Sequence, residues 1–183
     1  LSNTYNFKKE YATRSFNTVY ATFNLWKNLK FTSTYSYDFV MNKSRAWKDP
    51  RTSDGDDDNG RFSKDYNDIT NMTWWNILTY QMKLNKKHNL DFLAGYEINS
   101  KESDGLGTTI SNFARTDKPE ISNGVVYQSM GGSNSCTRIV SYITRVNYDY
   151  ENKYYAGASW RTDGSSRLAR ENRWGNFWSI SGA

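Results

Sequence analysis

The sequence of 183 residues predicts an all-β fold, an antiparallel up-and-down meander of about seven strands. Three observations predict it. Apolar and polar side chains alternate with a period of two in seven stretches, no stretch of similar length has a helical period, and short and long connections alternate. Aromatic residues make up 16% of the chain, and such residues are enriched in strands because they pack well on a pleated surface.

The alternation is clearest in residues 29–39, where Leu29, Phe31 and Tyr35 alternate with Lys30 and Thr32. Each such stretch has one apolar and one polar face, because successive side chains of a strand point to opposite sides. The predicted strands are residues 15–25, 29–39, 71–84, 90–100, 138–150, 154–162 and 176–183.

The predicted connections follow a strict order, short then long. The short turns are Trp26–Asn28, Asn85–Asn89 and Glu151–Lys153, and the long polar loops are 40–70, 101–136 and 164–175. In a meander this order places every short turn at one end of the sheet and every long loop at the other. That asymmetry is typical of outer-membrane barrels.

A meander with one apolar face must cover that face. In water it needs a second sheet or a helix, whereas in lipid it needs closure, and bacterial barrels have at least eight strands in even number. Seven strands satisfy neither requirement. We therefore expect residues 1–183 to be a partial barrel domain within a large transmembrane β-barrel, with the remaining strands outside this chain. The mean hydropathy is low because half of the residues in such strands face water, but at −0.87 it is low even for a barrel and is the best support for a soluble alternative.

Aromatic residues gather near the predicted strand ends. Tyr148, Tyr150 and Tyr154 flank one short turn, and Trp74 and Trp174 lie near the long-loop end. Two such groups are typical of the aromatic girdles at membrane interfaces. Cross-strand packing in a soluble sheet is the alternative explanation.

The sequence offers little for catalysis or for nucleic-acid binding. The net charge of +5 is spread among acidic residues without a basic stripe, so no nucleic-acid partner is expected. His88, the single histidine, lies in a predicted turn, so no convincing catalytic constellation forms, and we expect no enzyme. We expect no cofactor, although Asp54, Asp56 and Asp58 have a calcium-loop spacing; Asn59 stands where such a loop needs glycine, and a solvated acidic loop is the alternative.

A set of short motifs in the last third of the chain resembles SusC/RagA-type TonB-linked outer-membrane transporters, a branch of the TonB-dependent receptors. The motifs are Tyr148–Tyr150, Lys153-Tyr154, Ala158-Ser159, Arg161-Thr162-Asp163-Gly164-Ser165-Ser166-Arg167 and Asn172-Arg173-Trp174-Gly175. Upstream, His88-Asn89-Leu90 and Gly95-Tyr96-Glu97 resemble the preceding hairpin of the family. Leu168-Ala169 and Phe177-Trp178-Ser179 depart from the family's usual Phe-Gly and Phe-Pro-Ser.

The resemblance implies a fold, a function and partners. It implies a plugged barrel of about 22 strands in the bacterial outer membrane that imports glycans or peptides without chemistry on them. It also implies an N-terminal plug, a TonB-contacting segment and a SusD-like surface lipoprotein, all outside this chain.

Two groups of residues are the candidate site. Arg145, Asn147, Asp149, Arg161 and Asp163 share the polar face of one hairpin and would face the barrel lumen, where they would contact plug or substrate, or pair with one another across strands. The second group is a predicted turn, in which Gly164 adopts a positive φ and Asp163 binds backbone amides. We favour a structural role for this turn over ligand contact. Its residues are Asp163, Gly164, Ser165, Ser166, Arg167, Asn172, Arg173, Trp174 and Gly175.

The main rival is a soluble β-rich carbohydrate-binding module whose exposed aromatic rings stack on sugars. Two stacked sheets with dry inner faces would favour the module, whereas a single sheet with uncovered apolar rows would favour the barrel.

Overall fold

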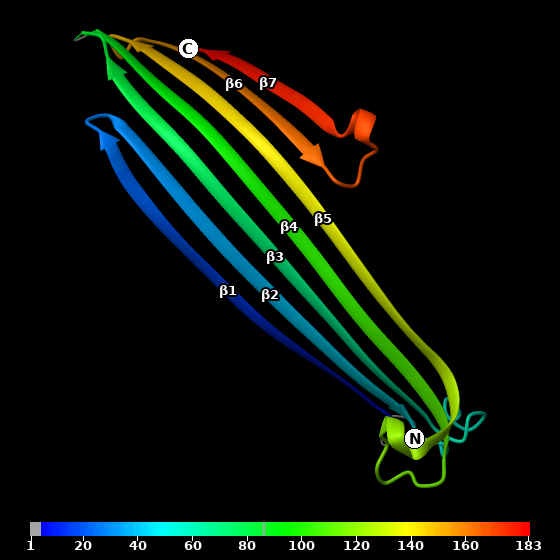
Figure 1. The fold of residues 1–183 in the computed structure, drawn as a ribbon. Coiled ribbons are helices and arrows are strands. Elements are labelled where there is room, and N and C mark those ends of the chain that lie inside the picture. Colours follow the sequence, from blue (N-terminus) through cyan, green and yellow to red (C-terminus); the bar gives the residue numbers. More distant parts are fainter. Residues whose placement is uncertain (1–4, 86) are drawn as a thin grey trace. The chain divides into compact units, whose positions relative to one another are not determined.

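The computed structural model describes residues 5–85 and 87–183 and contains one seven-stranded antiparallel sheet. The strands are β1 (Phe7–Trp26), β2 (Leu29–Lys48), β3 (Arg61–Lys83), β4 (His88–Phe113), β5 (Gly124–Tyr150), β6 (Tyr154–Ser165) and β7 (Trp174–Gly182). They lie side by side in chain order (Figure 1), so the predicted all-β meander is confirmed. The helical elements are the 3₁₀ turns Ile121–Asn123 and Arg170–Asn172, and no helix in the described residues is long and apolar enough to cross a membrane.

Four of the strands extend far into the stretches predicted as loops. Residues 40–70 and 101–136 were expected to be loops, but only 49–60 and 114–123 lie between strands. The prediction was wrong because the apolar residues of these stretches are sparse and do not alternate regularly with polar ones, so the strands there show no hydrophobic period. Hydrogen-bonded polar pairs join their strands, as between Ser63 and Thr109 (2.9 Å) and between Ser44 and Asp65 (3.0 Å).

The chain forms two compact units, each assembled from several stretches of sequence. Unit 1 contains the described residues up to Ser15 together with Phe39–Thr70 and Glu102–Ser135. Unit 2 contains Phe16–Asp38, Asn71–Lys101 and Cys136–Ala183. Unit 2 holds the short turns and most of the alternating sequence.

Unit 1 contains the buried hydrophobic cluster of the described residues. Trp47, Phe62 and Phe113 are buried together, and the rings of Trp47 and Phe113 meet edge-to-face at 4.8 Å. Gly60 has a φ of +87° and lies against the Trp47 ring, where a Cβ would be 2.6 Å from the indole. A glycine is required here for both reasons.

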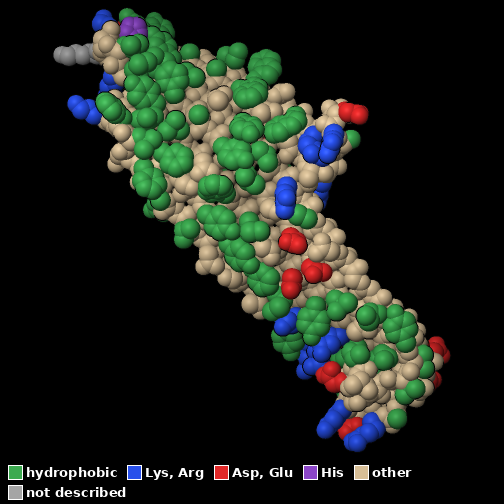
Figure 2. All heavy atoms as spheres, viewed as in Figure 1, with side chains coloured by type: hydrophobic (Ala, Val, Ile, Leu, Met, Phe, Trp, Pro, Cys, Tyr) green, Lys and Arg blue, Asp and Glu red, His purple; other side chains and the backbone are tan. Residues whose placement is uncertain are grey.

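Unit 2 has a different character, because its apolar side chains lie uncovered on one face of the sheet. Trp178 and Ile180 are 75% and 77% exposed, and Figure 2 shows hydrophobic side chains gathered over these strands. Stacked ring pairs cross from strand to strand, such as Phe23 with Phe31 and Tyr80 with Phe92. No second layer covers this face in the part of the chain that the structure describes, which is the arrangement predicted for a barrel wall.

His88 departs from its expected place in a solvated turn. It is the first residue of β4, and its Nδ1 lies 2.6 Å from the Tyr148 hydroxyl. Its ring also contacts the Tyr150 ring, with centroids 4.9 Å apart. It therefore belongs to the aromatic group beside the short turns.

Candidate functional site

The polar face of the β5–β6 hairpin is defined by the strand register. Ser141 lies opposite Asp163, Ile143 opposite Arg161, and Arg145 opposite Ser159. Because directly opposed residues point to the same side of a sheet, the five predicted lumen residues do share one face. The register extends that face into β7, where Ser179 lies opposite Ser159 and their hydroxyls are 2.7 Å apart.

Arg161 is the centre of a polar cluster on this face. Its Nε donates to both carboxylate oxygens of Asp163 at 2.8 and 2.9 Å, and its Nη2 donates to Ser141 Oγ at 3.2 Å. Glu97 on β4 lies 3.9 Å from the same Nη2. Asp163 therefore binds Arg161, and not the backbone amides that the turn prediction assigned to it.

Asp149, at the end of the hairpin, stabilises the short turn. Its Oδ1 accepts from the backbone N of Asn152 at 2.7 Å, and its Oδ2 accepts from Asn89 Nδ2 at 3.1 Å. Glu151 and Asn152 both have φ near +50°, a conformation that needs such local support.

The other two predicted lumen residues line open hollows. Arg145 and Asn147 border a hollow of about 230 Å³ together with small residues of β6 and β7, among them Gly157 and Ser181. Asn147 also borders a larger hollow of about 570 Å³ beside the short turns. The structure thus joins Arg161 with Asp163, whereas Arg145 and Asn147 border hollows of the same face within the described residues.

The Asp163–Arg167 motif joins the end of β6 to β5 and β7. Gly164 does not have the positive φ expected of it; it lies in β6 opposite Trp174, where a Cβ would be 2.9 Å from the indole. Ser166 donates its backbone N–H to Arg138 O and accepts the Arg138 N–H on its hydroxyl. The turn begins only after Ser165, so the prediction placed it too early.

The second half of the motif starts the last strand. Asn172 ends a 3₁₀ turn, the carbonyl of Arg173 accepts from the Ser165 N–H at 3.0 Å, and Gly175 lies opposite Asp163. These contacts position Trp174 against Tyr142, with ring centroids 6.1 Å apart.

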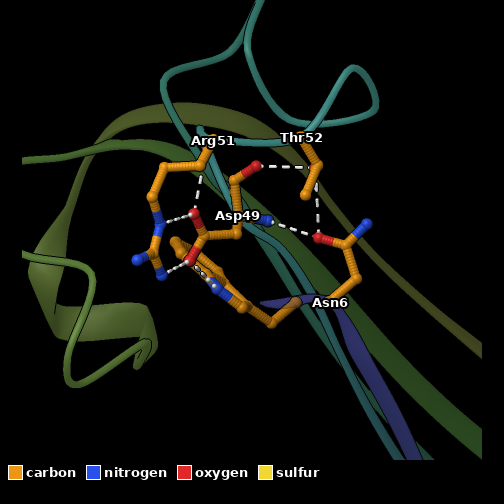
Figure 3. A network of polar contacts seen from close by, with 5 residues as sticks. Asn6, Asp49, Arg51 and Thr52 are labelled. Carbon is orange, nitrogen blue, oxygen red and sulfur yellow. Dashed lines mark hydrogen bonds and ion pairs between the residues drawn. The ribbon is translucent and has the colours of Figure 1, made fainter. Parts of the chain in front are cut away.

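The acidic loop at 49–60 is organised around Asp49 (Figure 3). Arg51 binds both carboxylate oxygens of Asp49 at 2.7 and 2.9 Å, and Asn6 Oδ1 accepts from the Asp49 backbone N–H at 2.8 Å. The Thr52 hydroxyl donates to the Asp49 carbonyl at 2.7 Å. The hydrogen bonds from Arg51 lower the pKa of the buried Asp49 carboxyl to about 2.

The calcium candidates Asp54, Asp56 and Asp58 lie in this loop. Asp58 forms an ion pair with Arg61, and no group of three or more His, Cys, Asp or Glu residues is placed to hold a metal among residues 5–85 and 87–183. The expectation of no cofactor, with calcium at these three residues as the weaker alternative, remains a prediction.

Two further residues of the polar face were not among the predicted site residues, Trp75 and Glu97. The sequence contained the signal for Trp75. Side chains alternate along a strand, so Trp75 must point to the polar face if its neighbour Trp74 points to the apolar face. Trp75, Glu97 and Arg161 line one groove.

Comparison with curated proteins finds TonB-dependent receptors. The chain is 26% identical over 160 residues to TonB-dependent receptor P3 of Formosa agariphila, covering 86% of this chain and 16% of that protein. It is 27% identical over 185 residues to receptor P39 of the same organism, covering 96% and 18%. TonB-dependent receptor SusC of Bacteroides thetaiotaomicron is 46% identical over 43 residues, which are 24% of this chain and 4% of that protein. No family model matches.

Comparison with solved structures finds the same architecture. The RagAB peptide transporter superposes with a TM-score of 0.91 at 20% sequence identity, over 98% of this chain and 20% of that chain. The siderophore receptor PiuA from Acinetobacter baumannii superposes with a TM-score of 0.53 at 14% identity. The chain therefore spans less than a fifth of the two Formosa receptors, and its sheet has the fold of one part of the RagAB structure.

Proposed function

We propose that this chain is a barrel segment of a TonB-dependent receptor of the SusC/RagA type, and that the protein containing it imports a bulky nutrient, a glycan or a peptide, across the bacterial outer membrane. The observation that carries the proposal is the uncovered apolar face of unit 2. Exposed contiguous apolar surface of this kind marks an interaction site, and lipid is the partner that suits rows of aromatic and aliphatic residues on one side of a closed sheet.

The polar face then lines the enclosed side of the wall. Arg145, Asn147, Asp149, Arg161 and Asp163 would contact the plug or the passing substrate there. The arrangement supports passage and not chemistry, because Arg161 and Asp163 neutralise each other and Asp149 is engaged in its turn.

The rest of the machinery lies in other parts of the protein or in partners. We propose a plug and a TonB-contacting segment in the same polypeptide, and a SusD-like lipoprotein over the outer opening. TonB, energised by the inner-membrane proton gradient, would drive the plug to open.

The rival carbohydrate-binding module needs two packed sheets. A single sheet is present in the described residues, and the described buried hydrophobic residues are Trp47, Phe62 and Phe113, all in unit 1. Unit 2 would leave most of its aromatic surface in water, which favours the barrel over the module.

The test is fractionation and uptake with the full-length protein in its own bacterium. We expect the protein in the outer-membrane fraction, and uptake of labelled oligosaccharides or oligopeptides that stops when TonB is deleted. Recovery in the soluble fraction would contradict the proposal, and so would uptake that is unchanged without TonB.

A further inference from the structure

A groove of about 250 Å³ lies on the polar face of unit 2, apart from the turns and loops. Its lining includes Trp75 and Ile77 of β3, Gly95 and Glu97 of β4, Ile143 of β5 and Arg161 of β6. Gly95 lies in the floor of the groove. A Cβ there would be 3.6 Å from Ile143 Cβ, which is an ordinary contact, so an alanine fits at this position without a clash. The absence of a side chain at Gly95 keeps the groove open.

Trp75 gives the groove an aromatic wall on a face that is otherwise mostly polar. Its neighbour Trp74 lies on the apolar face, where its Nε1 donates to Ser33 Oγ at 2.9 Å. Trp75 therefore points to the opposite side, and it is 45% exposed. Because the Trp75 indole lies on the polar face, it does not contact the lipid that would cover the apolar face.

The polar groups beside Trp75 supply hydrogen bonds but little free charge. Arg161 uses Nε for Asp163 and Nη2 for Ser141 and Glu97 within the described residues, which leaves Nη1 as a donor. Glu97 makes a 3.9 Å ion pair with Arg161 and is 20% exposed, so its carboxylate oxygens remain available as acceptors. With two carboxylates around one guanidinium, the cluster does not favour an anionic ligand.

We propose that this groove binds one ring of a neutral saccharide, with the apolar face of the ring on Trp75 and its hydroxyls on Glu97 and Arg161. An apolar wall with a few convergent polar groups is the usual composition of a ligand site, and a hydroxyl both donates to a carboxylate and accepts from a guanidinium. This inference rests on the proposed function, because it requires the polar face to line the import passage.

A peptide fits the same groove less well. Peptides that bind sheets pair with a free strand edge, whereas β4 and β5 lie in the interior of this sheet with a neighbour on each side. Charged peptide ends need unpaired charges, and the guanidinium of Arg161 is already shared between two carboxylates.

The experiment measures binding of neutral oligosaccharides to the detergent-solubilised full-length protein by calorimetry. The probes are maltohexaose, cellohexaose, xylohexaose and mannohexaose, with a pool of six-residue peptides in parallel. Trp75→Ala tests the aromatic wall, Gly95→Ala fills the floor without a clash, and Trp74→Ala is the matched control on the opposite face.

We expect at least one of the four sugars to bind, and Trp75→Ala to weaken that binding about tenfold or more, the loss of roughly 1.4 kcal/mol of contact. Gly95→Ala should weaken it as well, and Trp74→Ala should leave it unchanged. The proposal is overturned if none of the sugars binds or if Trp74→Ala and Trp75→Ala have equal effects.

The outcomes separate this inference from the proposed function. If peptides alone bind and their uptake depends on TonB, the saccharide site is wrong while the importer stands. If the full-length protein is recovered in the soluble fraction, the importer fails and the groove loses its premise.

Discussion

Gly164 on β6 lies directly opposite Trp174 on β7, and the indole occupies the space where a side chain at position 164 would begin. The two residues are ten positions apart in the sequence, in separate motifs on either side of the 3₁₀ turn. The strand register brings them together on the apolar face, where Trp174 also stacks with Tyr142.

Gly164→Ala should destabilise the last hairpin. The added Cβ would lie 2.9 Å from three atoms of the Trp174 ring, and forcing an extra methyl group into a packed position costs about 1–3 kcal/mol. The measurement is the unfolding midpoint of the full-length protein in detergent. Gly131→Ala is the control, because nothing lies within 4 Å of a Cβ at that position; equal midpoints for the two variants would contradict the contact.

Asp49→Asn should loosen the 49–60 loop at neutral pH. Folding lowers the pKa of Asp49 from 3.8 to about 2, so its stabilisation is complete above pH 3.8 and is lost as the pH falls through about 2. The shift corresponds to about 2–3 kcal/mol, or roughly sixtyfold in the local opening equilibrium.

Hydrogen exchange of the full-length protein measures this opening at the Thr52, Gly55 and Gly60 amides, which are hydrogen-bonded within the loop. The protection lost in Asp49→Asn should shrink as the pH approaches 2. Asp57→Asn, at an exposed position of the same loop, should change little at any pH. A difference between Asp49→Asn and the natural protein that is independent of pH would argue against the charged network.

Phe62→Ala should destabilise unit 1 locally. Phe62 is fully buried in the cluster with Trp47 and Phe113, and truncation of a buried phenylalanine costs about 3–5 kcal/mol. Faster amide exchange in residues 61–63 and 111–113 is the expected readout. Tyr127→Ala removes an aromatic ring that is exposed in the same unit and should leave this exchange unchanged.

Adjacent positions of β7 should sense different solvents. Ile180 lies on the apolar face and Ser179 on the polar face, so spin labels on Ile180→Cys and Ser179→Cys should differ in the membrane. We expect the first to be relaxed by oxygen dissolved in lipid and the second by a water-soluble nickel complex. Cys136 is exposed and is first replaced by serine. Equal accessibility of both labels to both reagents would contradict a two-faced wall.

Strands with one apolar face could be predicted from the sequence. The period-two pattern in residues 29–39, 90–100 and 138–150 predicted strands, and the structure has strands throughout those residues. The prediction failed in residues 40–48 and 101–113, which are also strands, because their few apolar residues are irregularly spaced and leave no period to detect. Those parts are joined by backbone ladders and by side-chain pairs such as Ser63 with Thr109, which become visible only after the register is known.

The sequence alone determined the fold class, the chain-order meander, the two faces of the hairpin at Arg145 and Arg161, and the resemblance to SusC/RagA-type receptors. These follow from local patterns, since alternation places side chains on one face or the other whatever the partner strand is. Only the tertiary structure decided that Gly164 makes room for Trp174, that Asp49 binds Arg51 at the base of a loop, and that Trp75 shares a groove with Glu97 and Arg161. The first and the last depend on which residues come to lie opposite one another, and therefore on strand register across the sheet. The Asp49–Arg51 pair depends on how the 49–60 loop folds back on itself.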